Sequence, residues 1–186
     1  MTQLTPVQWV QEELLAGRSL QPVLEHTSAY APANIALSKY WGKRETSFNL
    51  PLTGSLSVSL ADHGTQTELQ VIDGPAHEVY LNGERQNAQS AFSSKLAAWL
   101  GLFLPANVYL RINTHNTIPT AAGLASSASG FGAMALACND LCGWQLDYTS
   151  LSALARLGSG SASRSLWHGF VKWQAGTANN GHDSVA

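Results

Sequence analysis

Alternating apolar and polar residues mark several short strands in the first half of the chain. The segments 55–62 (SLSVSLAD) and 65–72 (TQTELQVI) both alternate with a period of two, and a short polar link separates them. The segment 78–83 (EVYLNG) follows after turn residues at 73–75 (DGP). This pattern predicts three strands joined as an antiparallel meander.

Apolar residues at helical spacing dominate the rest of the chain. Single strands are interleaved with these helical stretches, and this arrangement is typical of an α+β domain rather than an alternating parallel-sheet fold. The predicted helices cover 87–103, 124–142 and 149–158, and the predicted strands cover 107–114 and 168–176.

The N-terminal extension, residues 1–27, contains one short amphipathic segment. The run 6–17 (PVQWVQEELLAG) predicts a helix with Thr5 as its N-cap, Pro6 in its first turn and Gly17 at its end. We expect this helix to serve packing.

Composition limits the ligands that the protein can bind. A chain of 186 residues, 45% of them hydrophobic, suits one globular domain. Only 12% of the residues are charged and the net charge is -2. This balance lacks the positive surface that duplex nucleic acid or an anionic membrane requires, so we expect neither as a partner. A bound anion must then be small and locally held.

Apolar runs and cysteines point to a cytoplasmic protein without a metal site of its own. No stretch approaches the ~20 apolar residues of a membrane span, and Glu12 and Glu13 occupy the place of a secretory apolar region. Cys138 and Cys142 are four residues apart, unlike a CxxC motif, and no HExxH or Cys/His cluster accompanies them. We expect both cysteines to be buried as small apolar residues.

The run 119–130 (PTAAGLASSASG) is the first of three segments that suggest chemistry. Its small residues join a strand to a helix, so backbone N–H groups and the hydroxyls of Ser126, Ser127 and Ser129 can approach a phosphate. The Gly-Lys-Ser/Thr of the Walker loop is missing, so any lysine must come from elsewhere. The alternative is a small-residue helix start that permits close helix packing, as the alanines that follow would allow.

The run 31–45 (APANIALSKYWGKRE) is the second segment. Pro32 and Gly42 bracket it, which favours an extended strand and a tight turn over a helix. Tyr40 and Lys43 flank the turn and offer a hydroxyl and an ammonium group. Taken alone, such a run is more often a surface turn with an aromatic anchor.

The third segment is 156–166 (RLGSGSASRSL), a dense set of glycines and serines that ends near Arg164. Serine hydroxyls and exposed amides can hold phosphate oxygens, and a guanidinium supplies a fixed fork of donors for paired anionic oxygens. The alternative is a flexible loop with one solvated arginine.

Together these segments resemble the signature runs of the mevalonate diphosphate decarboxylase family, within the GHMP small-molecule kinase superfamily. Residues 31–60 (APANIALSKYWGK…NLPLTGSLSVSL) resemble the family's opening, PTAAGLASSASG its ATP phosphate loop, and GSGSASRSLWHGFVKWQ its diphosphate-binding run. The resemblance covers roughly residues 28–186. It implies that residues 1–186 form a GHMP-kinase-like N-terminal domain, with a mixed or antiparallel sheet and helices on one face.

The resemblance also implies a reaction. ATP phosphorylates a tertiary hydroxyl of mevalonate 5-diphosphate, after which phosphate and carbon dioxide leave to form isopentenyl diphosphate. The implied cofactors are ATP and Mg²⁺, and a homodimer is expected. The implied substrate-binding residues are Tyr40, Trp41, Gly42, Lys43, Ser159, Gly160, Ser161, Ala162, Ser163 and Arg164, and the implied ATP-binding residues are Asn116, Gly123, Ser126 and Ser127.

Departures from the family pattern leave alternatives open. Thr53-Gly54-Ser55 stands where the family usually reads Asn-Ser-Ser, and the family's catalytic aspartate belongs to a C-terminal domain beyond this sequence. We therefore assign no catalytic residue and expect the isolated chain to be inactive. The alternatives are a mevalonate or phosphomevalonate kinase-like phosphotransferase that does not decarboxylate, or a non-catalytic ligand-binding module.

Overall fold

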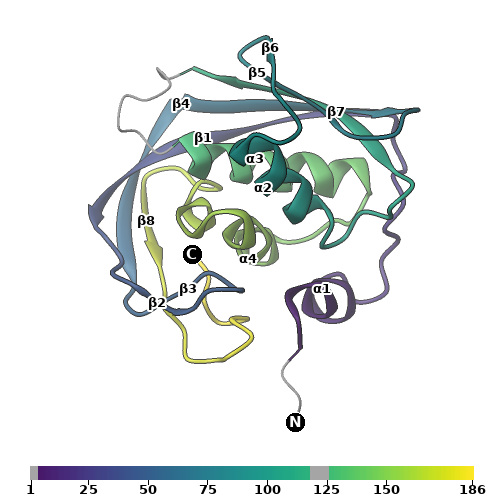
Figure 1. Ribbon diagram of the computed structural model, residues 1–186. Helices are drawn as coiled ribbons and strands as arrows, with labels where there is room; N and C mark the ends of the chain where they lie inside the picture. Colours follow the sequence, from purple (N-terminus) through teal and green to yellow (C-terminus); the bar gives the residue numbers. More distant parts are fainter. Residues whose placement is uncertain (1–3, 118–125) are drawn as a thin grey trace.

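A strongly curved mixed sheet wraps around the helices in the computed structural model, which describes residues 4–117 and 126–186 (Figure 1). The central strand is β4 (Ser55–Ile72), which pairs antiparallel with β1 (His26–Ser38). On its other side, β4 pairs with β8 (Phe170–Trp173) near its start and with β7 (Tyr109–Asn116) near its end. One long strand thus borders three others.

Two short strands complete the sheet at the far edge of β7. β5 (Glu78–Leu81) pairs with β7 in parallel, and β6 (Glu84–Arg85) pairs antiparallel with β5. A separate hairpin joins β2 (Lys43–Glu45) to β3 (Leu50–Pro51).

The helices lie on one face of the sheet, as expected (Figure 1). They are α2 (Ala91–Leu100), α3 (Ser126–Leu141) and α4 (Tyr148–Gly158), and the short 3₁₀ helix η2 (Gly160–Arg164) follows directly after α4. α3 lies against β1 and β4. Three of its alanines, at 133, 135 and 137, are fully buried, so the small residues of α3 do serve close packing.

The predicted N-terminal helix is confirmed. α1 (Pro6–Gln8) continues as the π-helical turn η1 (Trp9–Leu14), and Thr5 caps it by accepting a hydrogen bond from the Gln8 N–H at 3.3 Å. Trp9 is buried and packs edge-on against Phe48 of the β2–β3 turn, with ring centroids 5.9 Å apart. The N-terminal extension therefore packs against the hairpin that carries Lys43.

The predicted meander is wrong. Residues 55–62 and 65–72 form one strand, β4, and the chain does not reverse at the polar link between them. Ala61 adopts a positive φ of 49°, and the register with β1 shifts between Pro32 and Asn34, so the extra residues are absorbed as an irregularity in the strand. The partners of β4 come from distant parts of the sequence instead.

Cys138 and Cys142 are free and buried among core residues, as predicted. Burial raises the pKa of Cys142 to about 12. Within residues 4–117 and 126–186, no helix has the length and apolar character needed to cross a membrane.

Candidate functional site

The second and third segments, and the described end of the first, meet where α4 gives way to η2. A Cβ added at Gly160 would lie 3.2 Å from the Tyr40 hydroxyl oxygen, so this hydroxyl sits directly against η2. The Tyr40 ring packs edge-on against Trp173 with centroids 5.0 Å apart. On the other side, the hydroxyl oxygens of Ser127 and Ser159 are 3.5 Å apart.

Arg164 is held at this junction by two strands. Its side chain is only 3% exposed, and it donates from Nη1 to the Ser55 hydroxyl and from Nη2 to Asn34 Oδ1 at 3.2 Å. Asn34 in turn donates to the Ser165 hydroxyl at 2.7 Å. The guanidinium carbon lies 6.0 Å from the Trp173 ring centroid, within reach of a cation–π attraction.

The charge of Arg164 is not balanced within the described part of the chain. Arg164 forms no ion pair there, and its Nε is buried without a hydrogen-bond partner. Burial lowers its pKa, although the nearby Tyr40 works in the opposite direction. A buried cation with a spare donor is costly unless an anion accompanies it, so this position suits an anionic ligand.

The predicted substrate-binding residues around Gly160 differ in their exposure. Ser159 and Ser161 are partly exposed, and their hydroxyl oxygens lie 3.4 Å apart. Ala162 and Ser163 are buried, and the Ser163 hydroxyl donates to the Gly160 carbonyl at 2.9 Å. These two residues are fully buried and offer no exposed group to a ligand, whereas Ser159 and Ser161 offer hydroxyls.

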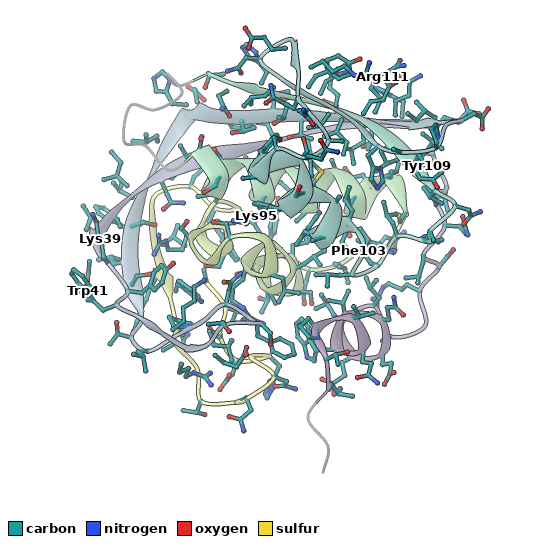
Figure 2. All side chains as sticks on the ribbon, in the orientation of Figure 1. Lys39, Trp41, Lys95, Phe103, Tyr109 and Arg111 are labelled. Atoms are coloured by element: carbon teal, nitrogen blue, oxygen red, sulfur yellow. The ribbon has the colours of Figure 1, made fainter. Side chains whose placement is uncertain are left out.

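The turn at 40–43 takes the conformation that its glycine permits. Gly42 has a φ of +68°, and a Cβ there would lie 2.8 Å from Leu52 Cδ1. Trp41 is 75% exposed and lies at the outer edge of the molecule (Figure 2). Lys43 instead donates from Nζ to the side-chain oxygen of Asn49 at 2.6 Å.

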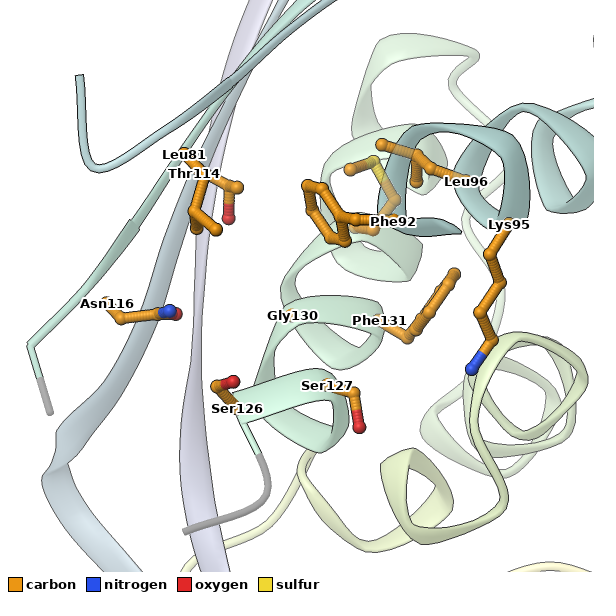
Figure 3. A pocket seen from close by; sticks show the side chains of 11 residues that line it. Leu81, Phe92, Lys95, Leu96, Thr114, Asn116, Ser126, Ser127, Gly130 and Phe131 are labelled. Atoms are coloured by element: carbon orange, nitrogen blue, oxygen red, sulfur yellow. The ribbon is translucent and has the colours of Figure 1, made fainter. Parts of the chain in front are cut away.

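A pocket of about 190 Å³ lies next to the start of α3. Its walls combine apolar side chains from α2 and α3 with a polar end, where Asn116 comes from β7 and two serines come from α3 (Figure 3). The lining residues are Leu81, Phe92, Lys95, Leu96, Thr114, Asn116, Ser126, Ser127, Gly130, Phe131 and Met134.

Three predicted ATP-binding residues line this pocket, and the fourth cannot be placed. Asn116 is fixed because its Oδ1 accepts a hydrogen bond from Thr65 at 2.8 Å. Ser126 and Ser127 form the first turn of α3. Gly123, together with the rest of residues 118–125, lies outside the described residues.

Lys95 was not predicted from the sequence. It projects from α2, and its Nζ lies 5.2 Å from the centroid of the Phe131 ring in the pocket wall (Figure 3). Burial lowers its pKa, and the positive charge of Lys43 lowers it further. Two lysines from separate segments therefore share this region, and neither forms an ion pair within the described ranges. Lys95 places a cation beside the pocket at the start of α3, but nothing in its helical pattern distinguishes it.

Asn34 and Ser55 were also missed, although both lie within runs that carry the resemblance. For Asn34 the available signal was a polar side chain within an otherwise apolar run, whereas Ser55 is one of several serines that alternate along β4; both residues are buried. The departure at Thr53-Gly54-Ser55 keeps the hydroxyl that accepts from Arg164.

Comparisons with known proteins identify the family of this chain. A family model for the diphosphomevalonate decarboxylase-like N-terminal domain matches residues 31–186. The diphosphomevalonate decarboxylase of Aspergillus fumigatus is 43% identical over 191 residues, covering 92% of this chain and 46% of the relative. That of Eremothecium gossypii is 40% identical over 174 residues, covering 86% of this chain and 44% of the relative.

Solved structures show the same fold. The mevalonate diphosphate decarboxylase of Staphylococcus aureus matches with a TM-score of 0.77 and 38% identity, over 84% of this chain and 48% of that one. The enzyme from Enterococcus faecalis matches with a TM-score of 0.72 and 39% identity, and the match covers 83% of this chain and 49% of that one. The chain thus spans about half the length of these relatives. It belongs to the family of diphosphomevalonate decarboxylase-like N-terminal domains.

Proposed function

We propose that the protein acts in the ATP-dependent decarboxylation of mevalonate 5-diphosphate to isopentenyl diphosphate, a step of isoprenoid biosynthesis. The observation that carries this proposal is Arg164, a buried guanidinium without an ion-pair partner in the described ranges, set beside the hydroxyls of η2. Membership of the family supports the same reaction.

The diphosphate would lie against η2. Two partly exposed hydroxyls, on Ser159 and Ser161, point to a common region beside Gly160. The Tyr40 hydroxyl closes this region on one side. Lys43 lies on the hairpin nearby and would add an ammonium group for the phosphoryl oxygens. These groups replace the hydration shell that the diphosphate loses on binding.

ATP would occupy the pocket between α2 and α3. The apolar walls suit an aromatic base, and the polar end beside Ser126 and Ser127 suits the phosphates. The Lys95 ammonium lies over the Phe131 ring in the wall of this pocket and would contact the phosphate chain. A related solved structure is described as "MDDEF in complex with MVAPP, AMPPCP and Magnesium".

Mg²⁺ would be held mainly by the nucleotide. The described residues contain no group of three His, Cys, Asp or Glu side chains that could bind a metal ion. The serine hydroxyls at the start of α3 are suitable additional ligands, because Mg²⁺ prefers oxygen donors and keeps several phosphate or water ligands. When bound, the ion would neutralise charge on the phosphoryl group being transferred.

The described residues position the reactants but offer no evident catalytic base. Two acidic side chains, those of Glu45 and Asp183, lie on segments around the site, and both accept hydrogen bonds from backbone amides. Glu45 accepts from the N–H groups of Ser47 and Phe48, and Asp183 accepts from those of Thr177 and Ala178. The contribution of this chain is therefore binding, orientation and charge stabilisation.

Product analysis tests the proposal. The protein as its gene encodes it should convert mevalonate 5-diphosphate and ATP to carbon dioxide, ADP, phosphate and isopentenyl diphosphate. If ADP appeared with a stable phosphorylated acid and no carbon dioxide, the protein would be a kinase-like phosphotransferase. If ligand bound without turnover, a binding module would remain.

We also propose a cytoplasmic homodimer, on the basis of the family resemblance. The outer face of the sheet offers support, because Ile35, Leu37 and Phe170 are 41%, 57% and 75% exposed there. Light scattering on the purified protein should give twice the mass of one chain. A mass of one chain at micromolar concentration would contradict the homodimer.

A further inference from the structure

Asn49 occupies a rigid position in the turn between β2 and β3. Its neighbours Phe48 and Leu50 are both buried in the core, at 1% and 0% exposure. The carboxylate of Glu45 closes the turn by accepting from the N–H groups of Ser47 at 2.9 Å and Phe48 at 2.6 Å. Asn49 itself has a φ of +53°, a conformation that asparagine tolerates better than most residues. The backbone that carries the Asn49 side chain is therefore held in one conformation.

The side-chain amide of Asn49 makes three hydrogen bonds in two directions. Its Nδ2 donates to the backbone carbonyls of Arg156 and Leu157, at 3.0 and 2.9 Å. Its Oδ1 accepts from the Lys43 ammonium at 2.6 Å. Carbonyls only accept and an ammonium only donates, so the chemistry of the partners fixes the orientation of this amide.

These partners belong to two separate parts of the proposed substrate site. Arg156 and Leu157 lie in the last turn of α4, where backbone carbonyls lack partners within the helix. Ser159 and η2 follow immediately along the chain. Lys43 lies on the opposite side of the amide. One side chain thus connects the end of the helix that precedes η2 with the lysine of the second segment.

Arg156 strengthens the same connection from the helix side. It is fully buried, and its Nε donates to the Phe48 carbonyl at 3.1 Å. Its Nη1 donates to the Gly181 carbonyl at 2.7 Å. The hairpin thus donates hydrogen bonds to α4 through Asn49, and α4 donates one to the hairpin through Arg156. A shift of Asn49 would break its bonds to α4 and disturb the neighbouring Phe48 carbonyl.

We propose that Asn49 is a positioning residue, which sets Lys43 and the Ser159–Arg164 run at the separation that a bound diphosphate requires. The inference rests on the proposed function, because it assigns that ligand to those groups. Aspartate would keep the contact with Lys43 but would repel the two carbonyls. Alanine or glycine would lose all three bonds.

The first test replaces Asn49 with glycine, which tolerates the positive φ and removes only the amide. The matched control is Gln145→Gly, because Gln145 also has a positive φ, of 56°, and is exposed between α3 and α4. Calorimetric titration of the 186-residue chain with mevalonate 5-diphosphate should show about tenfold weaker binding for Asn49→Gly. The control should match the parent.

A double-mutant cycle separates positioning from general destabilisation. If Asn49 acts partly through Lys43, Asn49→Gly should weaken binding less in a Lys43→Met background than in the parent. Equal fold-changes in both backgrounds would mean that Asn49 does not act through Lys43. Should the glycine variant fold poorly, Asn49→Asp keeps the side-chain volume and tests the two carbonyl contacts.

A measurement without ligand keeps this inference separate from the proposed function. Amide hydrogen exchange at 158–161 should be faster in Asn49→Gly than in Gln145→Gly, because the end of α4 has lost two bonds. If the parent fails to bind mevalonate 5-diphosphate, the proposed function falls while the exchange data still decide the role of Asn49. If Asn49→Gly left both the exchange rates and the affinity unchanged, the positioning role of Asn49 would be overturned.

Discussion

The Arg164 guanidinium donates to Asn34 Oδ1 at 3.2 Å, although 130 positions separate the two residues in the sequence. Asn34 belongs to β1 and Arg164 to η2, so this bond fixes the end of η2 on the sheet. It leaves the buried Nε without a partner in the described part of the chain. The guanidinium is therefore oriented by the sheet and keeps one donor without a partner among the described residues.

Arg164→Ala should weaken the binding of mevalonate 5-diphosphate by about 1.5–3 kcal/mol, the range for hydrogen bonds to charged groups. Calorimetric titration measures this loss. Arg111→Ala is a suitable control, because Arg111 forms a half-exposed pair with Glu78 on the outer part of the sheet. Identical titration curves for Arg164→Ala and the parent would contradict the assigned role.

Lys43→Ala should also weaken binding of the same ligand, because it removes an ammonium from the site. The charge-matched control is Lys172→Ala, since Lys172 is exposed on β8. Titrations at two salt concentrations should show a smaller salt dependence for Lys43→Ala than for the control. A ligand-bound crystal structure with Lys43 directed into bulk water would rule this role out.

Gly158→Ala should destabilise the fold by about 1–3 kcal/mol through overpacking. An added Cβ would lie 2.0 Å from Phe131 Cδ1, so α4 or the pocket wall must move. Gly130→Ala provides the contrast, because nothing lies within 4 Å of a Cβ there and alanine favours the helix. Thermal unfolding should give a lower Tm for the first variant and an equal or higher Tm for the second.

Stability should fall as the pH drops below about 6.5, the unperturbed pKa of histidine. Burial lowers the pKa of His77 in the fold, and its Nδ1 accepts from the Leu110 N–H at 3.0 Å. The unfolded chain therefore takes up this proton first, and stability is lost between pH 6.5 and the lowered folded pKa. The Tm of His77→Gln should decrease less between pH 7.5 and 5.5 than the Tm of the parent. The control is His168→Gln, at an exposed site, whose Tm should decrease as much as that of the parent.

The 186-residue chain alone should bind mevalonate 5-diphosphate but release negligible carbon dioxide with ATP. The described residues supply cations and hydroxyls, whereas the acids around the site are bound to backbone amides. A radiochemical assay for carbon dioxide measures this directly. Sustained turnover by the purified chain would show that its own residues complete the catalytic machinery.

Local patterns predicted most of the elements but not their pairing. The helices at 87–103, 124–142 and 149–158 appear as α2, α3 and α4, because their periodicity reflects the burial of one face. The period of two in β4 gives no information on which strand lies beside it. Its partner β1 was seen only as an extended run, so the pairing with β1 could not be anticipated.

The site was predicted to the extent that its residues lie in contiguous runs. Tyr40 and Gly160 were both expected at the substrate, and the fold brings them together. Asn49 could not be identified, because its proposed role depends on hydrogen bonds to carbonyls 107 and 108 positions away. Lys95 was missed for the same reason, since only packing of α2 against α3 turns a helical lysine into a pocket residue.

The long strand β4 carries the support for both proposed ligand sites. Near its start, Ser55 accepts from Arg164, and ten residues later Thr65 donates to Asn116. The spacing of the two proposed ligands thus depends on the length of this strand. A deletion of one residue in its regularly paired part, 56–58, would shorten it by about 3.3 Å and turn Ser55 to the opposite face. We expect such a deletion to abolish joint binding, whereas the exposed loop at 73–76 should accept one.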